Sequence, residues 1–102
     1  MEYKKKISLY KLDVEGELNV SPFEYLDTFA IRSELHRSRD QLKQCDLQLI
    51  QYCDQQLLNR IEEFYSYIAE IYSFNDSKKP LEEWWWHLDR VVAGELIVEL
   101  DK

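Results

Sequence analysis

The segment Ser21-Pro22-Phe23-Glu24 begins the longest uninterrupted part of this 102-residue chain, because no glycine or further proline follows until Pro80. A serine can cap a helix, proline suits the first helical position, and a glutamate three residues after the cap can bind the cap amide. The sequence therefore predicts a helix that begins at Pro22 and runs to about Arg37. Residues 38–41 have the pattern of a second capping box, and we place the first break there.

Apolar residues recur with helical spacing over the next part of the chain. At about 100° per residue, one stripe holds Leu47, Ile50, Leu57, Ile61, Phe64, Tyr65, Ile68 and Tyr72. A single helix over residues 40–73 would be about 50 Å long, whereas a domain of this size has a radius of gyration of roughly 13 Å. We expect this helix either to break or to protrude and be covered by another chain.

Both ends of the chain have the pattern of β-strands. Near-alternating apolar residues on either side of Gly16 predict an N-terminal β-hairpin, and residues 95–100 predict a terminal strand. The apolar residues of the hairpin are Ile7, Leu9, Tyr10, Leu12 and Val14 before the turn, and Leu18 and Val20 after it. Pro80 is expected to open a last helical region, which Gly94 ends.

The predicted fold class is α+β, in a single domain over residues 1–102. We expect the N-terminal β-hairpin and the C-terminal strand to form a small antiparallel sheet, because two strands alone are marginal in water. This sheet is expected to pack on an antiparallel bundle of three to four helices.

The overall charge disfavours two classes of partner. A net charge of −7 argues against direct binding to nucleic acid and against docking on anionic membranes. No segment approaches the roughly 18 continuous apolar residues of a membrane span, and no signal peptide follows Lys4-Lys5-Lys6. Cys45 and Cys53 would lie about 12 Å apart on one helix, too far for a disulfide. We therefore expect reduced thiols and a cytoplasmic protein.

Charge is also unevenly distributed along the chain. Residues 32–43 carry a net charge of +2, whereas residues 44–76 carry six acids against the single cation Arg60. Such an imbalance is typical of two segments that attract each other within the fold or across a dimer. A patch reserved for an outside partner is the alternative.

Trp84-Trp85-Trp86 is the most unusual motif. Successive helical residues point about 100° apart, so three tryptophans cannot share one face. Helical phase places Trp85 inside, Trp84 at the edge, and Trp86 on the opposite side with Glu83 and Arg90. Trp86 could fold along the surface, anchor a protein interface, or stack on a nucleotide base or another ring.

Tyr67 and Phe74 also fall off the apolar stripe of their helix. Together with Trp86 they indicate more apolar surface than one small core can bury. We therefore predict a homodimer, formed through the long helix or the Trp86 face. The expected interface residues are Trp86, Tyr67, Phe74, Glu83 and Arg90.

Asp54 interrupts the apolar stripe of the long helix, where a carboxylate is costly unless it is paired or placed at a helix end. Asp54 could cap a helix break, or form an ion pair with Arg32, Arg37 or His36. A catalytic or metal-binding carboxylate is the third interpretation. We take Asp54, His36 and Arg32 as a candidate buried polar cluster.

No motif predicts a cofactor, a metal site or a catalytic residue. Glu83 and His87 have a spacing that can chelate, but we favour a solvated helix face for both. Gly16 and Gly94 stand alone, so no phosphate-binding loop is expected. No motif for nucleophilic catalysis surrounds His36 or the two cysteines.

These patterns predict a non-catalytic interaction, assembly or regulatory module that presents an aromatic helix surface to another protein. One alternative is an acidic inhibitor or immunity-type protein that blocks a basic, nucleic-acid-binding partner through residues 44–76. A second alternative is a small enzyme or ligand-binding domain that uses Asp54 with His36, which requires a concave pocket around both.

Overall fold

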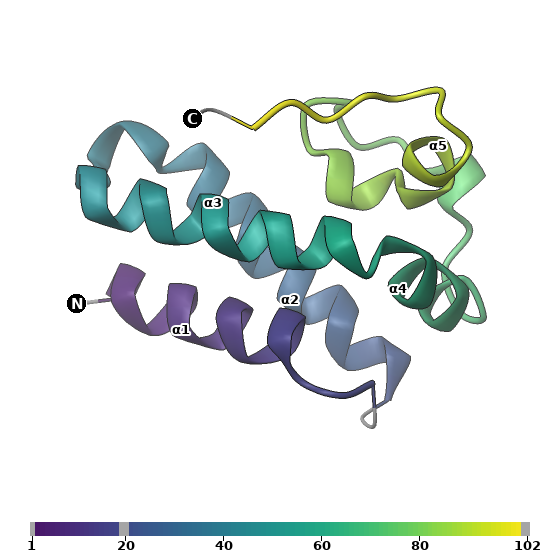
Figure 1. The fold of residues 1–102 in the computed structure, drawn as a ribbon, viewed down its shortest axis with the longest axis horizontal. Coiled ribbons are helices and arrows are strands. Elements are labelled where there is room, and N and C mark those ends of the chain that lie inside the picture. Colours follow the sequence, from purple (N-terminus) through teal and green to yellow (C-terminus); the bar gives the residue numbers. More distant parts are fainter. Residues whose placement is uncertain (1, 19–20, 101–102) are drawn as a thin grey trace.

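The computed structural model describes residues 2–18 and 21–100 (Figure 1). Within these residues the chain forms α-helices and short 3₁₀-helices and no β-strand. The α-helices are α1 (Glu2–Glu15), α2 (Pro22–Arg37), α3 (Gln44–Asn59), α4 (Ile61–Ile68) and α5 (Leu88–Val92). The 3₁₀-helices are η1 (Arg39–Gln41), η2 (Phe74–Asp76) and η3 (Trp84–Trp86). The described chain is helical, and the predicted α+β fold is wrong.

The predicted N-terminal hairpin is replaced by α1. Ile7, Tyr10 and Val14 are at most 1% exposed, and their spacing of three and four residues makes a helical stripe. This stripe packs where α1 contacts α2 and α3. Leu9 and Leu12 are 41% and 69% exposed, and these two solvent-facing leucines created the apparent strand alternation.

The turn expected at Gly16 ends a helix instead. The Gly16 amide donates to the Leu12 carbonyl at 2.9 Å, and a β-carbon on Gly16 would lie 2.9 Å from the same oxygen. A larger residue therefore requires this turn to shift. Leu18 packs partly buried against the main core, and Val20 of the predicted second strand lies outside the described residues.

The predicted start and end of α2 are confirmed. Ser21 Oγ accepts from the Phe23 amide at 3.2 Å, Pro22 is the first helical residue, and the helix ends at Arg37. The break at residues 38–41 is also confirmed, as η1. The capping box predicted at residues 38–41 is not present, because the Ser38 side chain makes no cap hydrogen bond. At the start of α3, Asp46 Oδ2 instead accepts from the Lys43 amide at 3.4 Å.

The long helix breaks at Arg60, between α3 and α4. The Arg60 guanidinium donates through Nη1 to the carbonyls of Val14 at 3.0 Å and Gly16 at 2.7 Å, so it also caps the end of α1. The break brings Phe64 of α4 against Tyr25 of α2, with ring centroids 5.5 Å apart. The radius of gyration is 12.9 Å, which a single rod of this length could not give.

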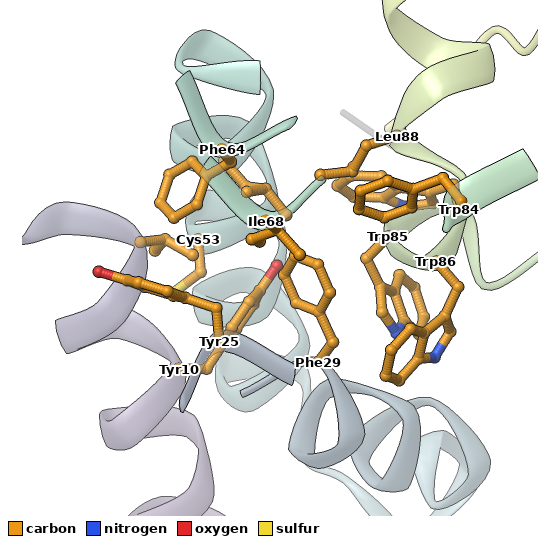
Figure 2. Close-up of a cluster of buried hydrophobic side chains, with 13 residues drawn as sticks. Tyr10, Tyr25, Phe29, Cys53, Phe64, Ile68, Trp84, Trp85, Trp86 and Leu88 are labelled. Carbon is orange, nitrogen blue, oxygen red and sulfur yellow. The ribbon is translucent and has the colours of Figure 1, made fainter. Parts of the chain in front are cut away.

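The main core lies where α1, α2, α3 and α4 meet the C-terminal third of the chain. Figure 2 shows its aromatic side chains gathered between these elements. The labelled members are Tyr10, Tyr25, Phe29, Cys53, Phe64, Ile68, Trp84, Trp85, Trp86 and Leu88. None of the helices in the described ranges has both the length and the apolar character that crossing a bilayer takes.

Residues 95–100 form no strand: residues 95 and 96 are bends, and residues 97–100 have no partner strand among the described residues. They follow Gly94, whose φ of 80° ends α5 as predicted. In Figure 1 this C-terminal segment runs back along the side of α3 that faces away from α1. The strand predicted here lacks a ladder because its intended partner, the N-terminal hairpin, is a helix.

Candidate functional site

Asp54 of α3 forms a buried ion pair with Arg32 of α2. Arg32 donates through Nε to Oδ1 at 2.9 Å and through Nη2 to Oδ2 at 2.8 Å. The hydroxyl of Tyr10 on α1 donates to Oδ1 at 2.6 Å. The ion-pair interpretation of Asp54 is therefore confirmed, and the N-cap interpretation is wrong because Asp54 lies inside α3.

In this cluster the Arg32 guanidinium balances the negative charge of Asp54, and hydrogen bonds from Arg32 and Tyr10 hold the carboxylate in place. Burial, followed by the charge of Asp54, raises the pKa of Tyr10 well above its ordinary value, so the phenol stays a donor. The Arg32 guanidinium lies 4.3 Å from the Trp85 ring centroid, a cation–π contact. The pair also joins the basic segment 32–43 to the acidic segment 44–76, as one interpretation of the charge pattern expected.

Ser33, the neighbour of Arg32 on α2, binds two of the three tryptophans. Its Oγ accepts from Trp85 Nε1 at 3.0 Å and from Trp86 Nε1 at 2.8 Å. It donates to Glu83 Oε1 at 2.7 Å. Figure 2 shows Trp85 and Trp86 projecting in the same direction, while Trp84 lies beside Leu88. No pattern in the sequence singled out this serine.

The predicted surface position of Trp86 is wrong. Trp86 is 6% exposed, Phe74 3% and Glu83 5%, and Tyr67 packs partly buried against the core. Of the five predicted interface residues, only Arg90 is exposed. The error came from assuming a regular α-helix over residues 84–86, where the chain forms the tighter turn η3.

Glu83 and His87 do not form the predicted solvated helix face. His87 is 3% exposed, and its Nε2 lies 2.9 Å from the Lys79 carbonyl oxygen. Glu83 binds Ser33 and lies 3.9 Å from Arg37 Nη1. Over residues 2–18 and 21–100, no group of three or more His, Cys, Asp or Glu residues could hold a metal ion.

A groove of about 840 Å³ opens beside the Arg32–Asp54 pair. One wall comes from α2, η1 and α3, and the other comes from residues 81–85 and from the C-terminal segment 96–100. Apolar lining residues include Leu35, Leu47, Ile50, Leu81, Trp84 and Ile97. Asp54 and His36 both line this groove, as the ligand-binding alternative required, but no hydrogen bond or ion pair joins these two residues.

Charges at the groove are predominantly acidic. Among the described lining residues, and with the closed Arg32–Asp54 pair set aside, Arg39 stands against three acids, Asp40, Glu82 and Glu99. His36 packs edge-on against Trp85 at 5.8 Å, and its Nε2 lies 3.5 Å from Glu82 Oε2. The groove therefore suits a ligand with apolar groups and positive charge.

Leu81 and Ile97 mark the rim of the groove. Leu81 is 51% exposed and Ile97 is 77% exposed, and both line the groove. Large apolar side chains in this position are typical of binding surfaces rather than of a closed core.

Comparison with known proteins gives no relative: no family model, no curated protein and no solved structure matches this chain.

Proposed function

We propose that this protein is a non-catalytic interaction module that binds a segment of another protein in the groove between α2–α3 and the C-terminal segment. The binding surface proposed here is this groove, where apolar side chains are exposed, and not the Trp86 face, which is buried. The volume of the groove, about 840 Å³, lies within the range of known ligand sites. The observation that carries the proposal is this groove, with exposed Leu81 and Ile97 at its rim.

The state of Asp54 supports binding rather than catalysis. Both of its oxygens already accept hydrogen bonds, from Arg32 and from Tyr10. A general base needs a carboxylate that can take a proton from a substrate, and an adjacent guanidinium opposes that step. We therefore assign Asp54 a structural role, in which it holds α1, α2 and α3 together at the groove.

The acidic lining of the groove supports a basic partner. Among the described residues, Asp40, Glu82 and Glu99 line the groove, and Arg39 is the one lining arginine or lysine outside the buried pair. The inhibitor hypothesis also expected a basic partner. That hypothesis placed the contact on the whole acidic segment 44–76, whereas the present proposal places it in one groove.

Site-specific photo-crosslinking tests the proposal. A photoreactive phenylalanine analogue at Leu81, expressed in the native cell, should give a discrete crosslinked product. The matched control is the same analogue at Leu12, which is 69% exposed on α1, away from the groove, and should give none. Loss of the Leu81 product, or identical products at both positions, would contradict the groove as the binding site.

A further inference from the structure

The C-terminal segment 96–100 has the side-chain pattern of a strand. Leu96, Val98 and Leu100 are partly buried, whereas Ile97 is 77% exposed and Glu99 is exposed. Alternation of buried and exposed side chains is the geometry of an extended strand on an apolar support. Leu96 and Val98 pack against the main core, so the segment is held in place from one side only.

Beyond Leu96, the backbone of this segment makes no hydrogen bond to another described segment. The amides of Glu95 and Leu96 donate to the Arg90 carbonyl at 2.8 and 3.1 Å. Backbone amide and carbonyl groups along a strand edge are a template for pairing with another chain.

Two spaces adjoin the segment. Residues 96–100 all line the groove of about 840 Å³, and residues 98–100 also line a smaller cavity of about 470 Å³ with Gln55 and Leu58. The larger space extends to His36, Trp84 and Leu47. A strand added on the edge that faces this larger space would lie inside the groove, with its inward side chains against the apolar wall.

We infer that the partner of the groove binds as an extended segment that adds a strand to residues 96–100, with apolar side chains facing inward and lysine or arginine facing outward. This inference rests on the proposed function and names the partner's chemistry. Five extended residues span about 16 Å, so the contact is a short one. Backbone hydrogen bonds would supply affinity and the groove would select the side chains.

Charge makes a basic partner a better occupant than a second copy. The segment carries Glu99 and directly follows Glu95, the groove adds Asp40 and Glu82, and the chain has a net charge of −7. A second copy would bring two more glutamates into an acidic groove. Acids on a free edge are a known means of suppressing self-pairing, whereas cross-strand pairs of opposite charge are favourable.

The inference is tested with synthetic peptides and the full-length protein. The probes are the capped hexapeptide KVKIKV and its charge-inverted counterpart EVEIEV, titrated while the backbone amide resonances of residues 96–100 are followed by NMR. KVKIKV should shift these resonances and slow their hydrogen exchange, and EVEIEV should bind at least about tenfold more weakly. Absence of KVKIKV binding at millimolar concentration would overturn the inference.

N-methylation distinguishes strand addition from other modes of binding. Alternate amides of a strand point to the same edge, so methylating one alternate set of KVKIKV amides should abolish binding, and methylating the other set should not. Equal binding of both methylated peptides would rule out strand pairing.

Charge reversal in the protein provides the matched variants. Glu99→Lys leaves Asp40 and Glu82 opposed by Arg39 and the new cation, so the preference for KVKIKV over EVEIEV should be lost. Glu70→Lys, an exposed site after α4, changes the net charge equally and should leave the preference intact. If both variants behave alike, the effect is one of overall charge and the inference fails.

Sedimentation equilibrium of the unliganded protein tests the rival occupant. A single-chain mass at the concentrations of the titration is expected. A dimer that Glu99→Lys weakens or strengthens would show that a second copy occupies the edge, and would overturn the assignment of a basic partner. A Leu81 photo-crosslink to a different protein would still support the proposed function in that case, because that function requires only that the groove bind another protein.

Discussion

Replacement of Ser33 by alanine should destabilise this protein far more than the loss of one hydroxyl suggests. Ser33 Oγ accepts from the indole nitrogens of Trp85 and Trp86 at 3.0 and 2.8 Å, and it donates to Glu83 Oε1 at 2.7 Å. All four residues are buried. The variant would leave two indole N–H groups and one carboxylate oxygen in the core without these partners.

The expected magnitude follows from these three groups. A buried polar group without a partner costs about 1–3 kcal/mol, so three cost roughly 3–9 kcal/mol when the site does not relax. The whole stability of a small domain is about 5–15 kcal/mol. Deleting one oxygen leaves almost no cavity, so hydrogen bonding dominates the loss. Since 1 kcal/mol corresponds to about 4–8 °C for a domain of this size, the melting temperature should fall by at least about 12 °C.

Urea unfolding monitored by tryptophan fluorescence is the appropriate assay, because two of the three indoles bind the mutated side chain. Ser66→Ala, at an exposed position on α4, is the control and should change the free energy of unfolding by less than about 0.5 kcal/mol. A loss below about 1 kcal/mol in Ser33→Ala would refute the reasoning. It would mean that the indole nitrogens find other partners and that Ser33 does not hold the tryptophan turn.

Three further predictions concern buried groups. Trp86→Ala should lower the free energy of unfolding in denaturant by about 3–5 kcal/mol, and a change near zero would show that Trp86 is not buried. Asp54→Ala leaves the Arg32 charge buried and should lower the free energy of unfolding by about 3–5 kcal/mol. The double variant Arg32→Met/Asp54→Leu should recover most of that loss. A double variant that is as unstable as Asp54→Ala would contradict the pairing of the two charges. Burial, followed by the Asp54 charge, raises the pKa of the Cys53 thiol from 9.0 to about 12. The unfolded thiol loses its proton first, so stability should decrease between these pH values, and Cys53→Ala should reduce that slope. In the folded protein at pH 8, a thiol reagent should modify Cys45 and spare Cys53.

Part of the candidate site could be predicted from the sequence. A carboxylate at position 54 within an apolar helical stripe signalled a need for a partner, and Arg32 was among the three partners considered. Tyr10 was missed because it was assigned to a strand. Ser33 was missed as well, although it lies four residues after the buried Phe29 on α2 and so shares its face. A small polar residue on a buried helix face beside an arginine is the signal that could have found it.

The groove itself had no sequence signal. Its walls come from residues 32–54 and residues 81–100, which are far apart in the chain. Its shape depends on how the C-terminal segment lies relative to α3. Local patterns report which side chains face inward, but they do not report which distant segments leave a space between them.

The sequence by itself determined the features that rest on interactions within a few residues. These are the start of α2 at Ser21 and Pro22, its end near Arg37, and the end of α5 at Gly94, because caps, proline and a positive φ are local. The tertiary structure decided whether the segment containing Ile7, Tyr10 and Val14 is helix or strand, since both patterns bury apolar residues and only packing on α2 and α3 separates them. It also decided that residues 97–100 make no backbone hydrogen bond to another described segment, because a strand needs a partner that its own sequence does not contain.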